Sequence, residues 1–176
     1  MRVQDCYNFN DFRRLAKRRL PGPIFDYIDG AADDETTYRR NTSAFEACDL
    51  IPNVLRGVEA VDMSVVVMGQ RLAMPVYCSP TALQRLFHYQ GERAVAAAAG
   101  KYGTMFGVSS LGTVSLEEAR RISDGPQVYQ LYFHKDRGLN SEMMARAKRA
   151  GIEVTTASLA ATESAISAQA SPSRLG

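Results

Sequence analysis

From residue 75 onward, short apolar runs alternate with segments of helical periodicity, and no other feature limits the fold of this chain as strongly. Strands and helices that alternate at this spacing form βαβ units around a parallel sheet, whose strands are apolar on both faces. A fourth strand is predicted to begin at Gly151. The sequence therefore predicts an α/β fold. The expected strands span 75–79, 104–109 and 127–133, and the expected helices span 91–102, 115–122 and 136–150.

The first 74 residues have a different pattern, with three expected helices and a β-hairpin. Asp33–Ala47 is predicted as a helix with acidic residues in its first turn, where the helix dipole favours them. The hairpin is expected to turn at Gly69-Gln70, and a capping box is expected at Ser115 and Glu118. The other two helices are expected at Phe9–Leu20, which Asn8 can cap, and at Ile24–Ile28.

Composition excludes several classes of protein. The 21 Lys and Arg residues nearly balance 19 Asp and Glu residues, which gives no reason to expect a nucleic-acid partner. Three cysteines without CxxC spacing argue against a disulfide framework or a metal site and favour a reducing compartment. There is no apolar run of membrane-spanning length, no signal-peptide pattern and no GxGxxG after a strand. We therefore expect a cytoplasmic protein without a dinucleotide-binding domain.

Polar residues follow each of the first three strands of the predicted sheet. In a barrel of parallel strands the active site lies at the carboxyl ends of the strands. Polar loops are common at such ends, so this pattern alone is weak evidence for a ligand site. The residues at these ends are Ser79, Pro80, Thr81 and Ala82, then Ser109 and Ser110, then Gln130, Leu131 and Tyr132.

Three strings in fixed order are more specific: LPGPIFDYIDGAADDE from Leu20, CSPTALQ from Cys78 and VYQLYFHKDR from Val128. In these strings the chain resembles the FMN-dependent L-2-hydroxy acid dehydrogenase and oxidase family, which includes glycolate oxidase, lactate dehydrogenase and mandelate dehydrogenase. The resemblance covers Asn8 to about Val154. It implies the N-terminal half of a (β/α)8 TIM barrel, preceded by a helical extension and a β-hairpin.

The resemblance also implies FMN as cofactor and hydride transfer from a small L-2-hydroxy acid to flavin N5, giving the 2-oxo acid. Tyr27 would bind the substrate carboxylate, and Tyr132 would bind near the hydroxyl as the catalytic residue. A phenol suits both roles because it donates a hydrogen bond without adding charge. His88, in contrast, is expected to be structural. The residues expected to contact FMN are Pro80, Thr81, Ala82, Ser109, Gln130 and Ser158.

The pattern breaks after the fourth strand. Ser158 and Ala160 stand roughly where the family has a Thr and an Asp, and the segment 155–176 is rich in Ala, Ser and Thr. One choice of ordinary codons for Leu159–Pro172, read from the third base, gives GGNGKRDLRAGFP, which resembles the family's Arg-rich motif; the third positions of the codons were free to choose. We therefore expect residues 155–176 to be a frameshifted tail, a sequencing error or a real lesion. The chain would then be a truncated fragment, and we expect it to be inactive without the second half of the barrel.

The sequence predicts three regions: an extension with the hairpin at 1–74, the first βα units at 75–154 and the tail at 155–176. The expected partners are a 2-hydroxy acid and an electron acceptor, which can be oxygen, a quinone or a cytochrome. A full-length homologue is expected to be a homo-oligomer, and its association with a membrane stays open. Two alternatives remain, another FMN barrel such as a flavin-dependent isomerase and a non-catalytic barrel fragment.

Overall fold

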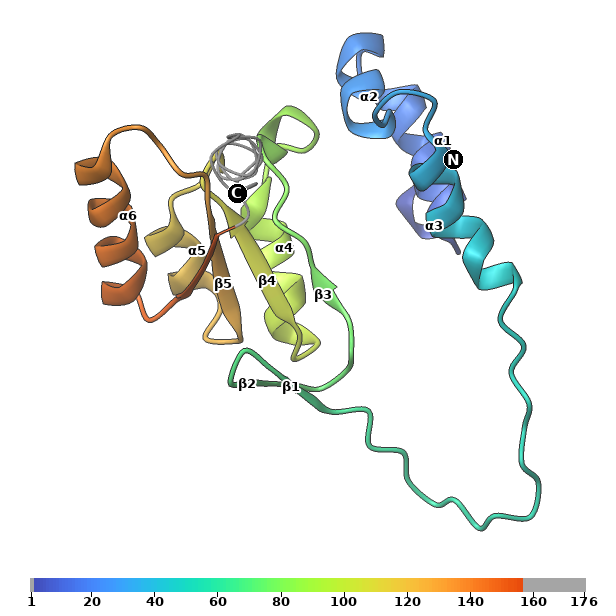
Figure 1. The fold of residues 1–176 in the computed structure, drawn as a ribbon. Helices are drawn as coiled ribbons and strands as arrows, with labels where there is room; N and C mark the ends of the chain where they lie inside the picture. Colours follow the sequence, from blue (N-terminus) through green and yellow to red (C-terminus); the bar gives the residue numbers. More distant parts are fainter. Residues whose placement is uncertain (1, 157–176) are drawn as a thin grey trace, which may run out of the picture. The chain divides into compact units, whose positions relative to one another are not determined.

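The computed structural model describes residues 2–156, which divide into two compact units (Figure 1). The first unit is Met1–Val61 and the second is Asp62–Gly176. This division places the hairpin with the sheet, whereas the sequence grouped it with the N-terminal helices. Ser158, Ala160 and the rest of the tail beyond Thr156 lie outside the described residues. No described helix has both the length and the apolar character that crossing a membrane requires.

The first unit contains a 3-10 turn and three helices, close to those that the periodicity predicts. The Asn8 side chain accepts a hydrogen bond from the Asp11 amide over 3.0 Å and so caps the first helix, as expected. Arg13 forms a two-point ion pair with Asp29, at 2.5 and 2.8 Å, which joins the first two helices. The elements are η1 (Val3–Asp5), α1 (Phe9–Arg19), α2 (Gly22–Asp29) and α3 (Thr36–Glu46).

The start of α3 differs from the sequence prediction. The helix begins at Thr36, so no acidic residue lies in its first turn. Asp33 and Glu35 instead adopt left-handed backbone angles, with φ of 48° and 56°, in the turn that precedes the helix. The Glu35 carboxylate accepts a hydrogen bond from the Ala31 amide over 3.2 Å. The acidic residues therefore shape this turn rather than the helix.

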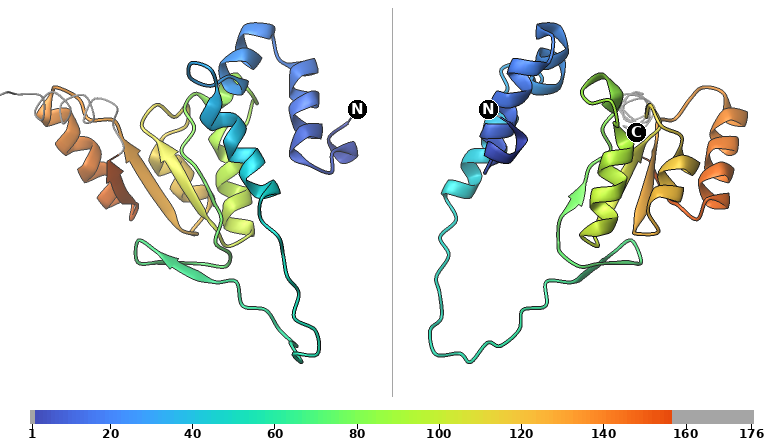
Figure 2. Two further views of the ribbon diagram at one scale, coloured as in Figure 1. Left: turned by 45° about the vertical axis from the view of Figure 1, so that its right-hand side comes forward. Right: turned by 180° about the vertical axis from the view of Figure 1, so that it is seen from behind.

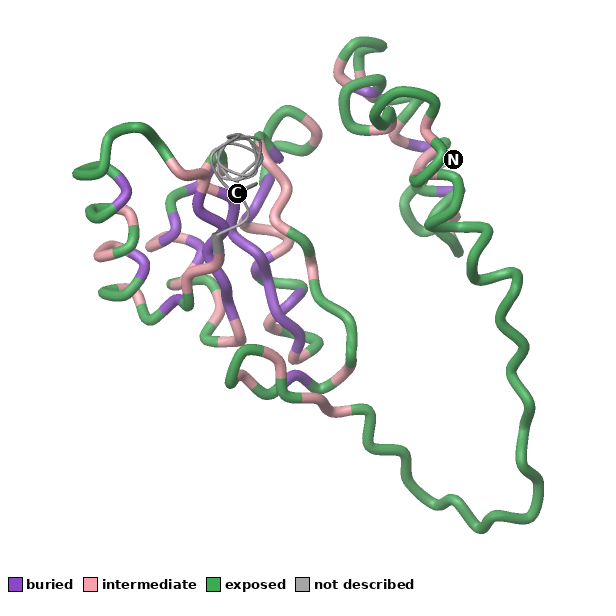
Figure 3. Tube along the Cα trace, in the orientation of Figure 1, coloured by how far each residue is buried: buried purple, intermediate pink, exposed green. Residues whose placement is uncertain are grey.

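The second unit is built on a four-stranded parallel sheet with strand order β3-β4-β5-β6. All five residues of β4 and all five of β5 are buried (Figure 3), which confirms that the central strands are covered on both faces. The strands are β3 (Tyr77–Cys78), β4 (Met105–Ser109), β5 (Gln127–Leu131) and β6 (Glu153–Thr156). The first two residues of the segment that we expected to be frameshifted thus belong to β6.

Three helices connect consecutive strands, α4 (Glu92–Lys101), α5 (Leu116–Ile122) and α6 (Arg137–Arg149). They pack on one face of the sheet through a core that contains Phe106, Val108, Tyr129 and Leu131 from the strands. Ser115 caps α5 by accepting a hydrogen bond from the Glu118 amide over 3.2 Å. The Glu118 carboxylate binds Arg93 on α4 at 2.6 Å, so it links two helices instead of completing the predicted capping box.

The hairpin consists of β1 (Val65–Val67) and β2 (Gln70–Leu72), antiparallel to each other. Its turn is Met68-Gly69, one residue earlier than predicted, because both residues have positive φ, at 50° and 74°. Leu72 is 1% exposed and packs against Met105 of β4 and Val128 of β5. The hairpin therefore covers the amino-terminal ends of the central strands, as the two views in Figure 2 show.

Candidate functional site

The parallel sheet brings most of the predicted site residues to one edge. Pro80, Thr81 and Ala82 lie in the loop after β3, which ends at Cys78. Ser109 ends β4, and Gln130 is the penultimate residue of β5. Tyr132 follows one residue after β5 and is half-buried. Since the carboxyl ends of neighbouring parallel strands lie side by side, six of the predicted residues share one end of the sheet.

Ser109 and Gln130 are in direct contact at this edge. They are register partners in the sheet, and the Ser109 hydroxyl donates a hydrogen bond to Gln130 Oε1 over 3.3 Å. Their exposed fractions are 5% and 7%. Ser109 Oγ also accepts a hydrogen bond from the Leu111 amide over 3.2 Å. The pair therefore joins two strands to the loop that follows β4.

The loop after β3 lies close to β4 because residue 107 is glycine. A Cβ added at Gly107 would lie 2.6 Å from Pro80 Cδ and 2.7 Å from Pro80 N. Leu83 has a positive φ of 55°, and its amide donates to the Leu111 carbonyl over 3.1 Å. Among the described residues, the Ala82 backbone amide has no hydrogen-bond partner. The loop thus holds Ala82 between a fixed proline and a fixed leucine.

Sequence reasoning missed one buried charged residue near this edge. Glu92 opens α4, is 0% exposed, and accepts hydrogen bonds from the Thr113 amide at 2.7 Å and the Thr113 hydroxyl at 2.6 Å. The sequence pattern that could have revealed this burial is the spacing of Glu92, Ala96 and Ala99, which lie on the same buried face of the helix. A carboxylate on an apolar face predicts a specific polar partner.

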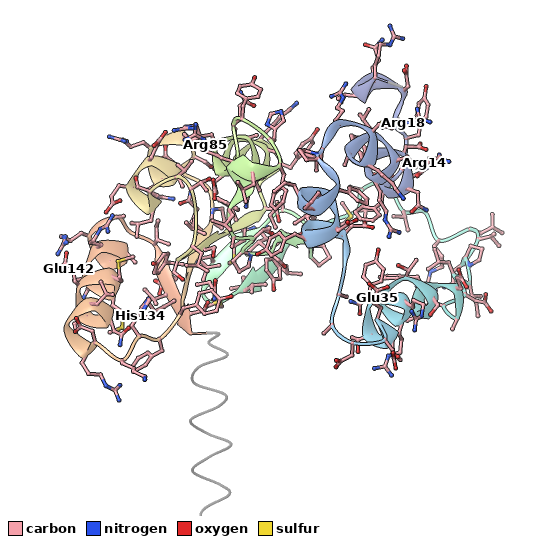
Figure 4. All side chains as sticks on the ribbon, turned by 90° about the horizontal axis from the view of Figure 1, so that it is seen from above. Arg14, Arg18, Glu35, Arg85, His134 and Glu142 are labelled. Carbon is pink, nitrogen blue, oxygen red and sulfur yellow. The ribbon has the colours of Figure 1, made fainter. Side chains whose placement is uncertain are left out.

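The loop after β5 carries Tyr132 and is held at both ends. The Tyr132 amide donates to Ser110 Oγ over 3.2 Å. Further along, Asn140 of α6 is 1% exposed and exchanges two hydrogen bonds of 2.8 Å with the backbone of His134, which is labelled in Figure 4. The backbone on both sides of Tyr132 is therefore fixed.

Two predicted residues lie elsewhere. Tyr27 belongs to α2 in the N-terminal unit and is 61% exposed, so its role at the strand ends stays a prediction. Ser158 lies outside the described residues. His88 accepts a hydrogen bond from the Gln90 amide through Nδ1 and contacts the Tyr89 ring, with ring centroids 4.6 Å apart.

A cavity of about 420 Å³ lies beside the loop that follows β3, and its walls include Thr81, Gln84, His88 and Cys78. Burial raises the pKa of the Cys78 thiol, so this group stays protonated at neutral pH. The described residues contain no group of His, Cys, Asp and Glu side chains able to hold a metal ion.

Comparison with known proteins gives a consistent result. The family model "FMN-dependent dehydrogenase" matches residues 16–162. Glycolate oxidase of Spinacia oleracea is 36% identical over 146 residues, which are 83% of this chain and 40% of that protein. Glycolate oxidase 1 of Oryza sativa subsp. indica is 38% identical with the same coverage. The chain thus spans about 40% of the length of these curated relatives.

Solved structures agree with this match. A mandelate oxidase bound to 3,3-difluoro-2-hydroxy-3-phenylpropionic acid superposes with a TM-score of 0.77 at 36% identity, over 84% of this chain and 44% of that one. A mandelate oxidase variant with the C4a-OH-FMN adduct superposes equally well, over 83% of this chain and 44% of that one. These neighbours are TIM-barrel oxidases, so the predicted fold, part of a (β/α)8 barrel, is confirmed.

Proposed function

The chain belongs to the FMN-dependent dehydrogenase family, and from this we propose that it contributes to FMN-dependent oxidation of a small L-2-hydroxy acid to the 2-oxo acid. The observation that carries the proposal is the buried Ser109–Gln130 pair at the carboxyl ends of β4 and β5. Buried polar side chains at this end of a barrel are characteristic of a ligand site. Residues 75–154 would supply the first βα units of the FMN barrel.

The groups at this edge fit the flavin. The pyrimidine side of the isoalloxazine ring presents both donors and acceptors, and Gln130 offers an amide with both kinds of atom. Ser109 would hold that amide through its hydroxyl, and the unpartnered amide of Ala82 would donate to the ring. Pro80 and Thr81 would lie along it, with Ser158 as a further contact. When bound, FMN supplies the hydride acceptor of the reaction.

Two tyrosines would bind the substrate. Tyr132 would donate a hydrogen bond near the substrate hydroxyl and so orient the C–H bond that reacts. Its amide is fixed by Ser110 and its loop by Asn140, which supports a defined position for the phenol. Tyr27 would donate to the substrate carboxylate. Neither group is charged as a phenol, so both would bind the anionic substrate through directed hydrogen bonds.

The relatives narrow the class of reaction. The relatives named above act, by name, on glycolate and mandelate, which are both small 2-hydroxy acids. Both are called oxidases, which supports oxygen as the electron acceptor, whereas a quinone or a cytochrome would suit a dehydrogenase. We propose a substrate from this chemical class, and we expect homo-oligomeric assembly of the whole protein.

Binding of FMN is the first test. Titrating the 176-residue chain into free FMN and following flavin fluorescence gives the dissociation constant. Gln130→Ala should raise that constant about tenfold, the value of one or two hydrogen bonds. Gln90→Ala, at an exposed loop position, is the matched control and should leave it unchanged. Equal binding by both variants would contradict the placement of Gln130.

Turnover is the second test. Glycolate, L-lactate or (S)-mandelate, added without oxygen to the FMN-loaded protein, should bleach the visible absorption of the flavin if the chain carries the reaction. If residues 155–176 are the frameshifted tail of an inactive fragment, bleaching should be weak or absent. Tyr132→Phe should slow this bleaching, and Tyr27→Phe should raise the substrate concentration that it requires. Bound FMN without bleaching by any 2-hydroxy acid would fit either the truncated fragment of this family or another FMN barrel, such as a flavin-dependent isomerase. Neither binding nor bleaching would favour a non-catalytic fragment.

A further inference from the structure

Glu92 is a charged residue that is completely buried, and the proposed reaction makes no use of it. Its Oε1 accepts from the Thr113 amide at 2.7 Å and its Oε2 accepts from the Thr113 hydroxyl at 2.6 Å. Burying a carboxylate costs several kcal/mol unless it is well hydrogen-bonded. Two short bonds to one residue are therefore a specific arrangement rather than a by-product of packing.

These bonds connect two different loops. Glu92 is the first residue of α4, directly after the loop that follows β3, and Thr113 lies in the loop that follows β4. The Thr113 hydroxyl also accepts a hydrogen bond from the Arg85 amide over 3.2 Å. Arg85, labelled in Figure 4, lies in a short 3-10 helix, η2 (Gln84–Leu86), in the segment that joins β3 to α4, three residues after Ala82. One threonine therefore bonds to both ends of the segment between residue 85 and α4.

The connection extends to the proposed flavin contacts. Leu111, two residues before Thr113, accepts from the Leu83 amide and donates to Ser109 Oγ. Fixing Thr113 thus limits the movement of Leu111. Leu111 in turn fixes the residue after Ala82 and the hydroxyl that holds Gln130. Glu92 touches none of the proposed contacts, but the loop that it holds bonds to Ser109, to Gln130 and to Leu83, the residue after Ala82.

We propose that Glu92 and Thr113 form a clamp that positions the Ala82 amide and the Ser109 hydroxyl for the flavin. This inference rests on the proposed FMN site. Glu92 is a positioning residue in this scheme, since it acts through Thr113. A carboxylate fits the role because both of its oxygens accept, whereas a glutamine offers one acceptor and one donor. A glutamine should therefore preserve part of the clamp, and an alanine should remove it.

Four variants and one control test the clamp. Glu92→Ala removes both bonds of the clamp. Thr113→Val keeps the amide bond but removes the two bonds of the hydroxyl, to Glu92 and from Arg85. Glu92→Gln and Thr113→Ser retain some or all of the bonds. Glu118→Ala is the control, because Glu118 bonds to Arg93, the residue after Glu92, and so joins α4 to α5 without holding either loop. If a variant acts through a general loss of packing between α4 and α5, Glu118→Ala should show the same change. If it acts through loss of the clamp, Glu118→Ala should behave like the unmodified chain.

Amide hydrogen exchange on the full chain is the first measurement. In Glu92→Ala and Thr113→Val, the amides of Leu83, Arg85 and Leu111 should exchange about tenfold faster or more, because one charge-assisted bond is worth that factor or more. The amides of β4 and β5 should be unaffected. Thr113→Ser and Glu118→Ala should match the unmodified chain in the loops. Unchanged loop exchange in the first two variants would overturn the clamp.

The FMN dissociation constant is the second measurement. Glu92→Ala should raise it about tenfold, Glu92→Gln by a smaller factor and Glu118→Ala by none. Faster loop exchange with unchanged FMN affinity would overturn the positioning role. If the unmodified chain fails to bind FMN, the proposed function fails for this chain, and hydrogen exchange still decides whether the clamp exists. The two failures are therefore distinguishable.

Discussion

The Ser109 hydroxyl lies 3.3 Å from Gln130 Oε1, and the two residues are also paired in the register of β4 and β5. The backbone amide of the next residue, Ser110, donates to the Gln130 carbonyl over 3.0 Å. Gln130 is therefore held by its side chain and by its backbone at once. An amide fixed in this way is suited to bind a planar ligand in one orientation.

Removing the Ser109 hydroxyl should lower the free energy of unfolding of the second unit. Ser109→Ala leaves Gln130 Oε1 and the Leu111 amide without their buried partner, at a cost of about 1–3 kcal/mol. Urea denaturation followed by circular dichroism measures the change. Ser141→Ala, at an exposed position of α6, is the control and should alter stability by less than about 0.5 kcal/mol. Equal stability of both variants would show that the bond contributes nothing.

Gly107 should not tolerate a side chain. In Gly107→Ala the new Cβ would come within 2.7 Å of Pro80 N, a backbone atom with little freedom to move. We expect a loss of about 1–3 kcal/mol and a displaced loop after β3. Gly138→Ala is the matched control, since its Cβ would approach only the carboxylate of Asp136, at 3.2 Å, and alanine favours a helix. Thermal unfolding measures the loss of stability in each variant.

The attachment of the hairpin to the sheet should depend on Leu72. Leu72→Ala would leave a cavity beside Met105 and Val128 and should cost about 2–4 kcal/mol. Val66→Ala, in the opposite strand of the hairpin but 70% exposed, should cost less than about 1 kcal/mol. Proteolysis at the hairpin, compared between the variants, shows whether it detaches. Resistance of the Leu72 variant would mean that the hairpin is held by other contacts.

Acid should weaken the contact between α5 and α6. Arg146 binds Glu117 through two hydrogen bonds, of 2.8 and 2.9 Å, and so lowers the pKa of that carboxyl in the folded chain. A group with a lower pKa when folded stabilises the fold above its unfolded pKa. That contribution is lost as the pH falls through its folded pKa. The window therefore begins near the ordinary glutamate range and extends below it.

Glu117→Gln tests this dependence. The variant should be less stable than the unmodified chain at neutral pH, and the difference should shrink as the pH falls from about 5 to about 3. Glu142→Gln is the control, because the Glu142–Arg149 pair is exposed, with Glu142 labelled in Figure 4. A difference that stays constant with pH would exclude the ion pair as its cause. Urea midpoints at each pH provide the comparison.

Much of the fold could be predicted because its signals are local. The apolar runs at β4 and β5, the helical spacing of α1 and the caps Asn8 and Ser115 each depend on a few neighbouring residues. The errors were also local, at the turn Met68-Gly69 and at the start of α3. Both depend on positive φ angles at residues other than glycine, which composition does not indicate.

The candidate site could be predicted only where a motif carried it. Strand ends and family strings identified Ser109 and Gln130, which the sheet then placed in contact. No motif indicated that Glu92 would bind Thr113, which lies 21 residues away, or that Asn140 would hold the backbone of His134. These side chains look like ordinary helix residues in the sequence. Their partners come from other loops.

The amino-acid sequence was enough to predict the order of strands and helices and the family, and it suggests the end of the sheet at which a ligand would bind. The tertiary structure alone decided which polar side chains meet there, and that the hairpin joins the sheet through Gln70 and Gln127, which are 57 residues apart. The reason is physical. Hydrophobic periodicity reports the face that each segment buries, whereas a hydrogen bond between loops requires the register and spacing of strands that only the assembled sheet fixes.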